Sequence, residues 1–504
     1  MLLLLVRCSK EEYDSSIKFD GYEKHLNITV PLKGTRDPFA FQNMNRALNK
    51  LKALRPELTD LTIKPNHLYL RFLPGNEIQM DLLLKDSSIV LFDHSLDSED
   101  YASPDTSSSG YGPQYCVVPI DRSLPAIPYE LLYEVFIPPD EATTKSSSTG
   151  SYSFYDELLS VSANLTGNLD SEDTLLQVSR SSGRRWNPSG RIRAWDDLVG
   201  DYIPLNHVNV HARWFTHIES SLTDSEGYFS MSSFRYKVNY SIKWENSFFT
   251  IRDGNFLQAW YNGPRIKGEW NLDIKGGKSI MFATIHRAAY RHFYGDNLGM
   301  VRPFLKAGGR TKICYSDNDG TGKFLGDYSA GGIFPDIKIW GRTNGEYKTT
   351  NKIFAVTAHE LGHQAHSQYL GNIRFWQTSN IIRESWAEAV EWALANDEYH
   401  KLGKEYSSDQ ALFYNHQIYK HNNWPNIADR DYSPIFIDLI DNINQYVEVG
   451  PEHPNDMISE YSISFINSNL LRNSNDISSL KSEVSKNKLE GVDDYKIKEL
   501  FGLY

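Results

Sequence analysis

Two histidines spaced four residues apart constrain this chain of 504 residues more than any other feature. His359 and His363 enclose Glu360 in an HExxH sequence, within an apolar run of helical period that begins at Ile353. Residues four apart lie on one face of an α-helix, so both imidazoles can bind one metal ion. Glu360 lies about 100° around the helix, where it can hold a water molecule beside the metal. The motif predicts a zinc-binding helix with its own general base; the alternative is a helix with two unrelated histidines.

A catalytic zinc site needs a third protein ligand. The class that adds a histidine six residues after the second is excluded, because Tyr369 occupies that position. A helix expected over 381–397 offers Glu384 and Glu388, which are four residues apart and share a face. We predict that Glu384 binds the metal and that Glu388 bonds the far nitrogen of His359 and orients it. The reverse assignment of the two glutamates stays open.

Two further residues lie close to this motif. Glu391 continues the helix face of Glu384 and is expected to be solvated or structural. His366 follows His363 by three residues on a related face. We expect His366 on the substrate side or around the ligands, and the alternative is a fourth nitrogen near the metal.

The motif and the later glutamate resemble the gluzincin arrangement of thermolysin-like and related peptidases. Twenty residues separate His363 from Glu384, and the similar part is a two-helix core over about 278–400. The resemblance implies zinc (Zn2+) as the cofactor and a protein or peptide as the substrate. The whole chain is similar to zinc-dependent metallopeptidase lipoproteins of unknown substrate.

The expected mechanism is hydrolysis by a zinc-activated water. Glu360 acts as the general base and passes the proton to the leaving amine. The oxyanion needs a donor opposite the metal, and the candidate is Tyr432. Three histidines are further candidates for this role: His416, His421 and His453. The strand expected over 334–340 is predicted to form the cleft edge that pairs with an extended peptide.

The chain is too long for one hydrophobic core, and 40% hydrophobic with 23% charged residues is a globular composition. We expect a multidomain α+β protein: an N-terminal α/β-mixed domain, a small antiparallel β-sandwich, and a C-terminal, mostly helical zincin-like metallopeptidase domain with a small sheet. The expected parts are a signal remnant and tether (1–25), an accessory domain (26–143), a linker or loop region (144–189), the β-sandwich (190–268) and the metallopeptidase domain (269–504). Within the accessory domain, alternation predicts strands over 68–72, 78–84 and 88–92.

Short alternating segments divided by turns predict the β-sandwich. The order of residues from Pro204 to Phe229 resembles carboxypeptidase-regulatory-like domains of the transthyretin-like type. This resemblance implies a spacer or docking module. In the Thr-Asp-x-x-Gly turn, Asp224 can bond backbone amides and Gly227 can adopt a positive φ.

The first eight residues suggest a surface anchor. The apolar run before Cys8 is too short to span a bilayer and looks like the end of a signal peptide. Cys8 resembles the lipid-carrying cysteine of bacterial lipoproteins, and the residues after it resemble an outer-surface signal. We expect a membrane-attached, extracytoplasmic protein of the outer membrane or cell surface. Two features depart from this pattern: there is no basic start, and Arg7 replaces a small residue. The alternative is a buried or spare cysteine.

Charge and cysteine content narrow the possible functions. A net charge of −12 argues against non-specific nucleic-acid binding. Three cysteines cannot form a disulfide framework or a four-cysteine zinc site, so histidines and carboxylates must bind any metal. Two alternatives to a peptidase stay open: a catalytically inactive surface-binding lipoprotein that retains a zincin fold, and a zinc hydrolase acting on a non-peptide amide.

Overall fold

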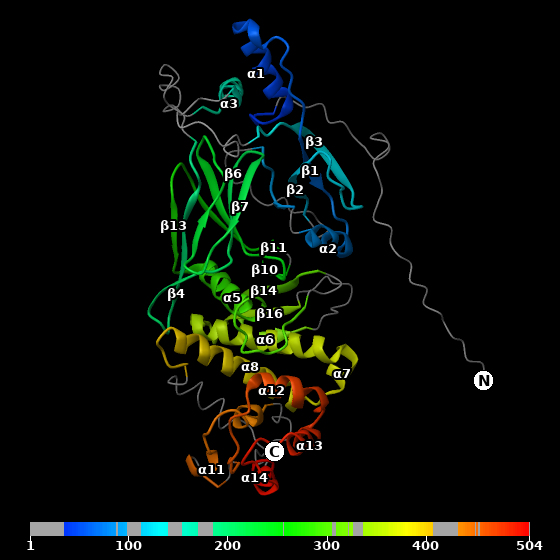
Figure 1. The fold of residues 1–504 in the computed structure, drawn as a ribbon, viewed down its shortest axis with the longest axis vertical. Coiled ribbons are helices and arrows are strands. Elements are labelled where there is room, and N and C mark those ends of the chain that lie inside the picture. Colours follow the sequence, from blue (N-terminus) through cyan, green and yellow to red (C-terminus); the bar gives the residue numbers. More distant parts are fainter. Residues whose placement is uncertain are drawn as a thin grey trace, which may run out of the picture. The chain divides into compact units, whose positions relative to one another are not determined.

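The computed structural model describes residues 35–86, 89–97, 112–139, 154–169, 185–255, 257–304, 309–320, 322–325, 336–406, 432–448, 450–451, 454–502 and 504. Helices and several separate sheets confirm the expected mixture of α and β structure (Figure 1). The chain forms two compact units. Among the described residues, the first unit takes in 35–75, 89–97, 112–139 and 154–169, and the second takes in 76–86 and everything from 185 onward.

The first unit combines a small sheet with two helices. Its antiparallel strands have the order β2-β1-β3, and α1 packs against α3. The bounds are α1 Phe41–Leu54, β1 His67–Phe72, β2 Gln114–Pro119, β3 Tyr129–Val135 and α3 Phe154–Leu165. Helix α3 therefore lies within the segment 144–189 that was expected to be a linker or loop.

Residues 78–84, expected as a strand, form most of helix α2 (Glu77–Lys85). The side chain of Asn76 accepts a hydrogen bond from the backbone of Gln79 at 3.0 Å. This is an N-cap, which satisfies one of the free amides at the start of a helix. The cap favours the helix, and the buried side chains Met80, Leu83 and Leu84 are spaced three and four residues apart, which is helical spacing.

Two four-stranded sheets form the β-rich part of the second unit. Their orders are β12-β9-β6-β7 and β13-β4-β5, with β8 paired to β4. Rings of Tyr240 on β9 and Trp270 on β13 lie 5.2 Å apart, so side chains of the two sheets meet. The pair β4–β13 is parallel, which differs from a purely antiparallel sandwich. The bounds are β4 Ser189–Asp196, β5 Asp201–Pro204, β6 Asn209–Trp214, β7 His217–Leu222, β8 Tyr228–Ser230, β9 Val238–Lys243, β12 Trp260–Ile266 and β13 Trp270–Ile274.

The turn before β8 has the predicted chemistry. Asp224 Oδ1 accepts hydrogen bonds from the backbone amides of Glu226 and Tyr228, both at 2.9 Å. Gly227 has a φ of +81°, and a Cβ there would lie 2.4 Å from the carbonyl oxygen of Ile192. Both the left-handed conformation and the close approach of β4 require glycine.

The third sheet of the second unit has the order β11-β10-β14-β16-β15, with β17 paired to β16. Strands β10, β14 and β16 run parallel, whereas β15 runs antiparallel to β16. The bounds are β10 Phe249–Asp253, β11 Leu257–Gln258, β14 Thr311–Asp319, β15 Gly322–Phe324, β16 Ile337–Thr343 and β17 Glu346–Tyr347. Strands β10 and β11 fall within 190–268 but belong to this sheet, so its pairing crosses the boundary expected at 268.

Two long helices contact this sheet, α5 (Gly277–Phe293) and α6 (Thr350–Leu370), and a third, α8 (Asn380–Lys401), packs against α6. Helix α6 packs against α5, α8, β15 and β16, and most of its residues are buried (Figure 1). A Cβ at Gly362 would lie 3.1 Å from Cβ of Val390, so α6 and α8 approach closely at this point. This contact brings the two helix faces with the motif residues together.

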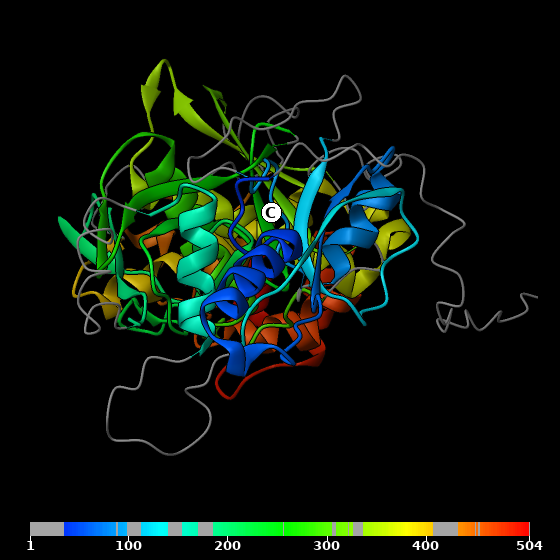
Figure 2. The same cartoon turned by 90° about the horizontal axis from the view of Figure 1, so that it is seen from above.

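Short helices of the C-terminal part, orange to red in Figures 1 and 2, pack against α8. A hydrophobic core joins the apolar face of α8 to residues from 435 to 501. The bounds are α7 Asn372–Gln377, α10 Ile435–Asp438, α11 Gln445–Glu448, α12 Ile463–Phe465, α13 Ile477–Lys486 and α14 Asp494–Leu500. Among the described residues, no helix is both long enough and apolar enough to cross a membrane.

A buried network of ion pairs and hydrogen bonds connects the end of β4 to α5 and α8. Asp196 is fully buried, and its Oδ2 accepts hydrogen bonds from Arg287 on α5 at 2.7 Å and from Tyr399 on α8 at 2.9 Å. Arg291 on α5 also binds Glu398 on α8, at 2.9 Å. The network therefore fixes α5 and α8 relative to the β-rich part.

Candidate metal centre

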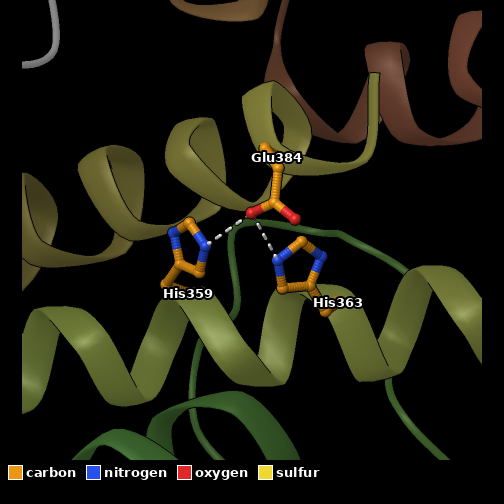
Figure 3. A group of neighbouring side chains, drawn as sticks. All are labelled: His359, His363 and Glu384. Atoms are coloured by element: carbon orange, nitrogen blue, oxygen red, sulfur yellow. Dashed lines mark hydrogen bonds and ion pairs between the residues drawn. The ribbon is translucent and has the colours of Figure 1, made fainter. Parts of the chain in front are cut away.

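Helices α6 and α8 bring the three predicted metal ligands together (Figure 3). Glu384 Oε2 lies 3.1 Å from Nε2 of His363 and 3.5 Å from Nε2 of His359. One ligand atom of each residue lies within 4.8 Å of the other two. Two imidazole nitrogens and a carboxylate oxygen directed at one point are a donor set that suits Zn2+.

Burial differs among the three residues. The two histidines are buried, whereas the side chain of Glu384 keeps 25% of its surface exposed. Solvent therefore reaches the group from the side of Glu384. Three protein ligands, which leave a fourth position for water or substrate, are typical of catalytic zinc sites, whereas structural sites have four.

Two more glutamates face the other side of His359. Glu388 Oε2 lies 3.5 Å from Nδ1 of His359, beside the nitrogen that it was predicted to bond. Glu391 Oε2 lies 3.2 Å from the same nitrogen and is 8% exposed. Of the two expectations for Glu391, solvated or structural, its burial contradicts the first, because α8 turns this residue into the contact with α6.

Glu360 is buried against the short strand β15. A Cβ at Gly322 would lie 2.3 Å from Glu360 Oε1, so only glycine leaves room for this carboxylate. Burial raises the pKa of Glu360 to about 7, while His359 and a backbone hydrogen bond with Phe324 lower it. A metal ion nearby would favour the charged carboxylate.

The ligand residues influence one another electrostatically. Burial lowers the pKa of His359, but hydrogen bonds to three glutamates outweigh this effect and leave the pKa well above 6.5. The pKa of His363 is lowered by burial. Burial raises the pKa of Glu384, but hydrogen bonds to both histidines outweigh it, so the net shift is downward. Glu384 is therefore ionised, and His359 must release a proton to bind a metal.

Tyr432, the predicted oxyanion donor, lies next to one of the predicted ligands, His359. Its ring centre is 6.2 Å from that of His359. The next residue, Ser433, is bound to α8: its backbone amide donates to Ser385 Oγ at 2.8 Å, and the two hydroxyls are 2.9 Å apart. Ser385 directly follows Glu384, so one turn of α8 positions both. The alternative donors His416, His421 and His453 lie outside the described residues.

An aromatic cluster borders the site next to His363. The rings of Phe324 and Phe375 lie 6.2 and 6.3 Å from the ring of His363. Trp376 is 54% exposed, and the guanidinium of Arg383 lies 4.9 Å from its ring centre. No spacing in the sequence indicated this cluster, because β15, α7 and α8 each contribute only one or two of its residues.

His366 belongs to this cluster and not to the group of ligands. It is buried, its ring lies 5.4 Å from that of Phe375, and burial lowers its pKa to about 3. Neither ring nitrogen has a hydrogen-bond partner among the described residues. The structure therefore places His366 next to Phe375 as a buried, neutral side chain.

The strand that was expected to form the cleft edge, over 334–340, is not at the end of the sheet path. Strand β16, which contains most of 334–340, lies between β14 and β15 in the sheet. The end of the sheet path beside α6 is β15, and β15 also contacts Glu360. The prediction for 334–340 is wrong because the hairpin partner β15 covers that side of β16.

Neither a family model, nor a curated protein, nor a solved structure matches this chain. The resemblance to gluzincins and to carboxypeptidase-regulatory-like domains therefore stays a prediction. It rests on the HExxH motif with Glu384 and on the order of residues from Pro204 to Phe229.

Proposed function

We propose that this chain is a zinc-dependent peptidase. The observation that supports the proposal is the convergence of His359, His363 and Glu384 within 4.8 Å, with Glu360 next to them on α6. Bound zinc would supply Lewis-acid chemistry, which lowers the pKa of water and polarises a carbonyl group. This donor set, open to solvent on one side, fits such a role.

Glu360 is the proposed general base. It accepts a proton from the attacking water and returns it to the leaving amine. The carboxylate is buried and confined between α6 and Gly322, which restricts its orientation. Such confinement holds the base in one position through both proton transfers.

Tyr432 and β15 would bind the substrate. The hydroxyl of Tyr432 donates to the oxygen on which negative charge develops, and the anchor at Ser433 limits its movement. An extended peptide would pair with the backbone of β15 at the end of the sheet. The exposed ring of Trp376 offers apolar surface close to the same place.

Incubation of the purified chain with an unstructured protein tests the proposal. We expect cleavage that stops on addition of a chelator and returns with zinc, and no cleavage by Glu360→Gln. Zinc binding without cleavage of any peptide bond would contradict the peptidase function. The proposed attachment through a lipid on Cys8 is a separate prediction, because Cys8 lies outside the described residues.

A further inference from the structure

The geometry points to Glu391 as a positioning residue that orients His359 for zinc, with Glu388 as the weaker partner. The inference rests on the proposed zinc site. It goes beyond the glutamate pair of the motif, because Glu391 lies seven residues after Glu384 and three after Glu388.

The distances favour Glu391. The imidazole of His359 carries at most one hydrogen on Nδ1, and that hydrogen makes its best hydrogen bond to a single acceptor. Glu391 Oε2 is 3.2 Å from Nδ1, whereas Glu388 Oε2 is 3.5 Å from it. Only the shorter distance is close to that of an ordinary hydrogen bond.

Helix geometry explains why the later residue reaches the nitrogen. Seven residues rotate the side chain by about two full turns, so Glu391 returns to within about 20° of the direction of Glu384. Glu388 is displaced from that direction by about 40° in the opposite sense. His359 lies one turn before His363 on α6, and Glu391 lies beyond Glu384 on α8. Glu384 thus meets Nε2 of His359, and Glu391 meets Nδ1 behind it.

Burial gives this contact its strength. Glu391 and Glu388 are 8% and 9% exposed, so the interaction is little screened by solvent. Among the described residues, the carboxylate of Glu391 pairs with the imidazole of His359. A carboxylate on Nδ1–H fixes the tautomer that leaves the Nε2 lone pair for the metal and makes that nitrogen a stronger donor.

Zinc affinity, measured by competition with a chromogenic chelator, tests the inference. We expect Glu391→Gln to weaken zinc binding by about 10- to 100-fold, and Glu388→Gln to weaken it less. The variant Glu391→Asp keeps the charge but shortens the side chain, and it should also weaken binding. The exposed Glu346 on β17 provides the control Glu346→Gln, which should leave the affinity unchanged.

A second readout separates positioning from a general structural role. The visible spectrum of the cobalt-substituted chain reports the ligand field at the metal, and we expect it to change in Glu391→Gln and not in Glu346→Gln. Unfolding of the metal-free variants measures their stability independently. An affinity within about twofold of wild type in both Glu391 variants, with an unchanged cobalt spectrum, would overturn the inference. A wild-type chain that binds no zinc would instead refute the proposed function.

Discussion

Replacing Gly322 with alanine places a methyl group directly against the proposed base. The new Cβ would lie 2.3 Å from Glu360 Oε1, 2.8 Å from Glu360 Cγ and 2.6 Å from Val356 Cγ1. Ordinary contacts begin near 3.4 Å, so β15 or the carboxylate must move by about 1 Å. These three nearest atoms belong to Glu360 and Val356 and not to a predicted metal ligand, so the substitution acts first on the base.

The size of the expected effect follows from this displacement. Misplacing a reacting group by about 1 Å costs about 100-fold in rate, which corresponds to ~2.7 kcal/mol of activation free energy. We therefore predict that Gly322→Ala lowers kcat on a peptide substrate by about 100-fold while zinc content stays at the wild-type level. Overpacking would also lower the free energy of unfolding by about 1–3 kcal/mol.

The assay combines steady-state peptide hydrolysis, metal analysis and thermal unfolding. Gly276 provides the matched control, because a Cβ there meets nothing within 4 Å and its φ is not positive. Gly276→Ala should keep the wild-type kcat. If Gly322→Ala also had the wild-type kcat, the proposal that Glu360 acts as the general base from its position against β15 would be refuted.

Three further predictions concern protons and buried charges. Zinc binding near pH 6.5 should release protons, because the pKa of His359 and that of Glu360 are both raised in the metal-free chain. Titration calorimetry in buffers of different ionisation enthalpy measures the number of protons released, and zero net release would contradict the prediction. Asp456→Asn should raise the free energy of unfolding at pH 7 in denaturant titrations. Burial, with Asp438 nearby, raises the pKa of Asp456 in the folded state, so the folded chain holds a proton that the unfolded chain loses. Stability should accordingly fall as pH rises above about 4 in the wild type, and an equally steep fall in Asp456→Asn would argue against this. Asp196→Ala should lower the free energy of unfolding by about 3–5 kcal/mol, because it leaves the buried Arg287 guanidinium without this carboxylate. A loss below about 1 kcal/mol would contradict the prediction and show that Glu398 compensates.

The parts of the site that a local pattern specifies were predictable from the sequence. Helical spacing alone places His359 and His363 on one face of α6. It likewise places Glu384 and Glu388 on one face of α8. Whether α6 and α8 approach closely enough depends on packing at Gly362, which no periodicity reports. The close approach also carries Glu391 into the interior, whereas the sequence pattern left open whether this residue is solvated or structural.

The parts that depend on tertiary pairing were not predictable. Strand β15 has three residues, and it exists because it pairs with β16 and lies against α6. Residues 78–84 alternate only weakly, and the cap at Asn76 favours a helix. Strands β10 and β11 continue the chain of the β-sandwich yet pair in the third sheet. In each case a partner distant in sequence, or a flanking residue, overrides the local pattern.

The central claim is that His359, His363 and Glu384 together bind one zinc ion. Metal analysis of the purified wild-type chain and of Glu384→Ala, after reconstitution with zinc and removal of the excess, tests it most directly. We predict about one zinc per chain in the wild type and almost none in Glu384→Ala. A wild-type chain without zinc, or a Glu384→Ala chain that retains it fully, would contradict the account.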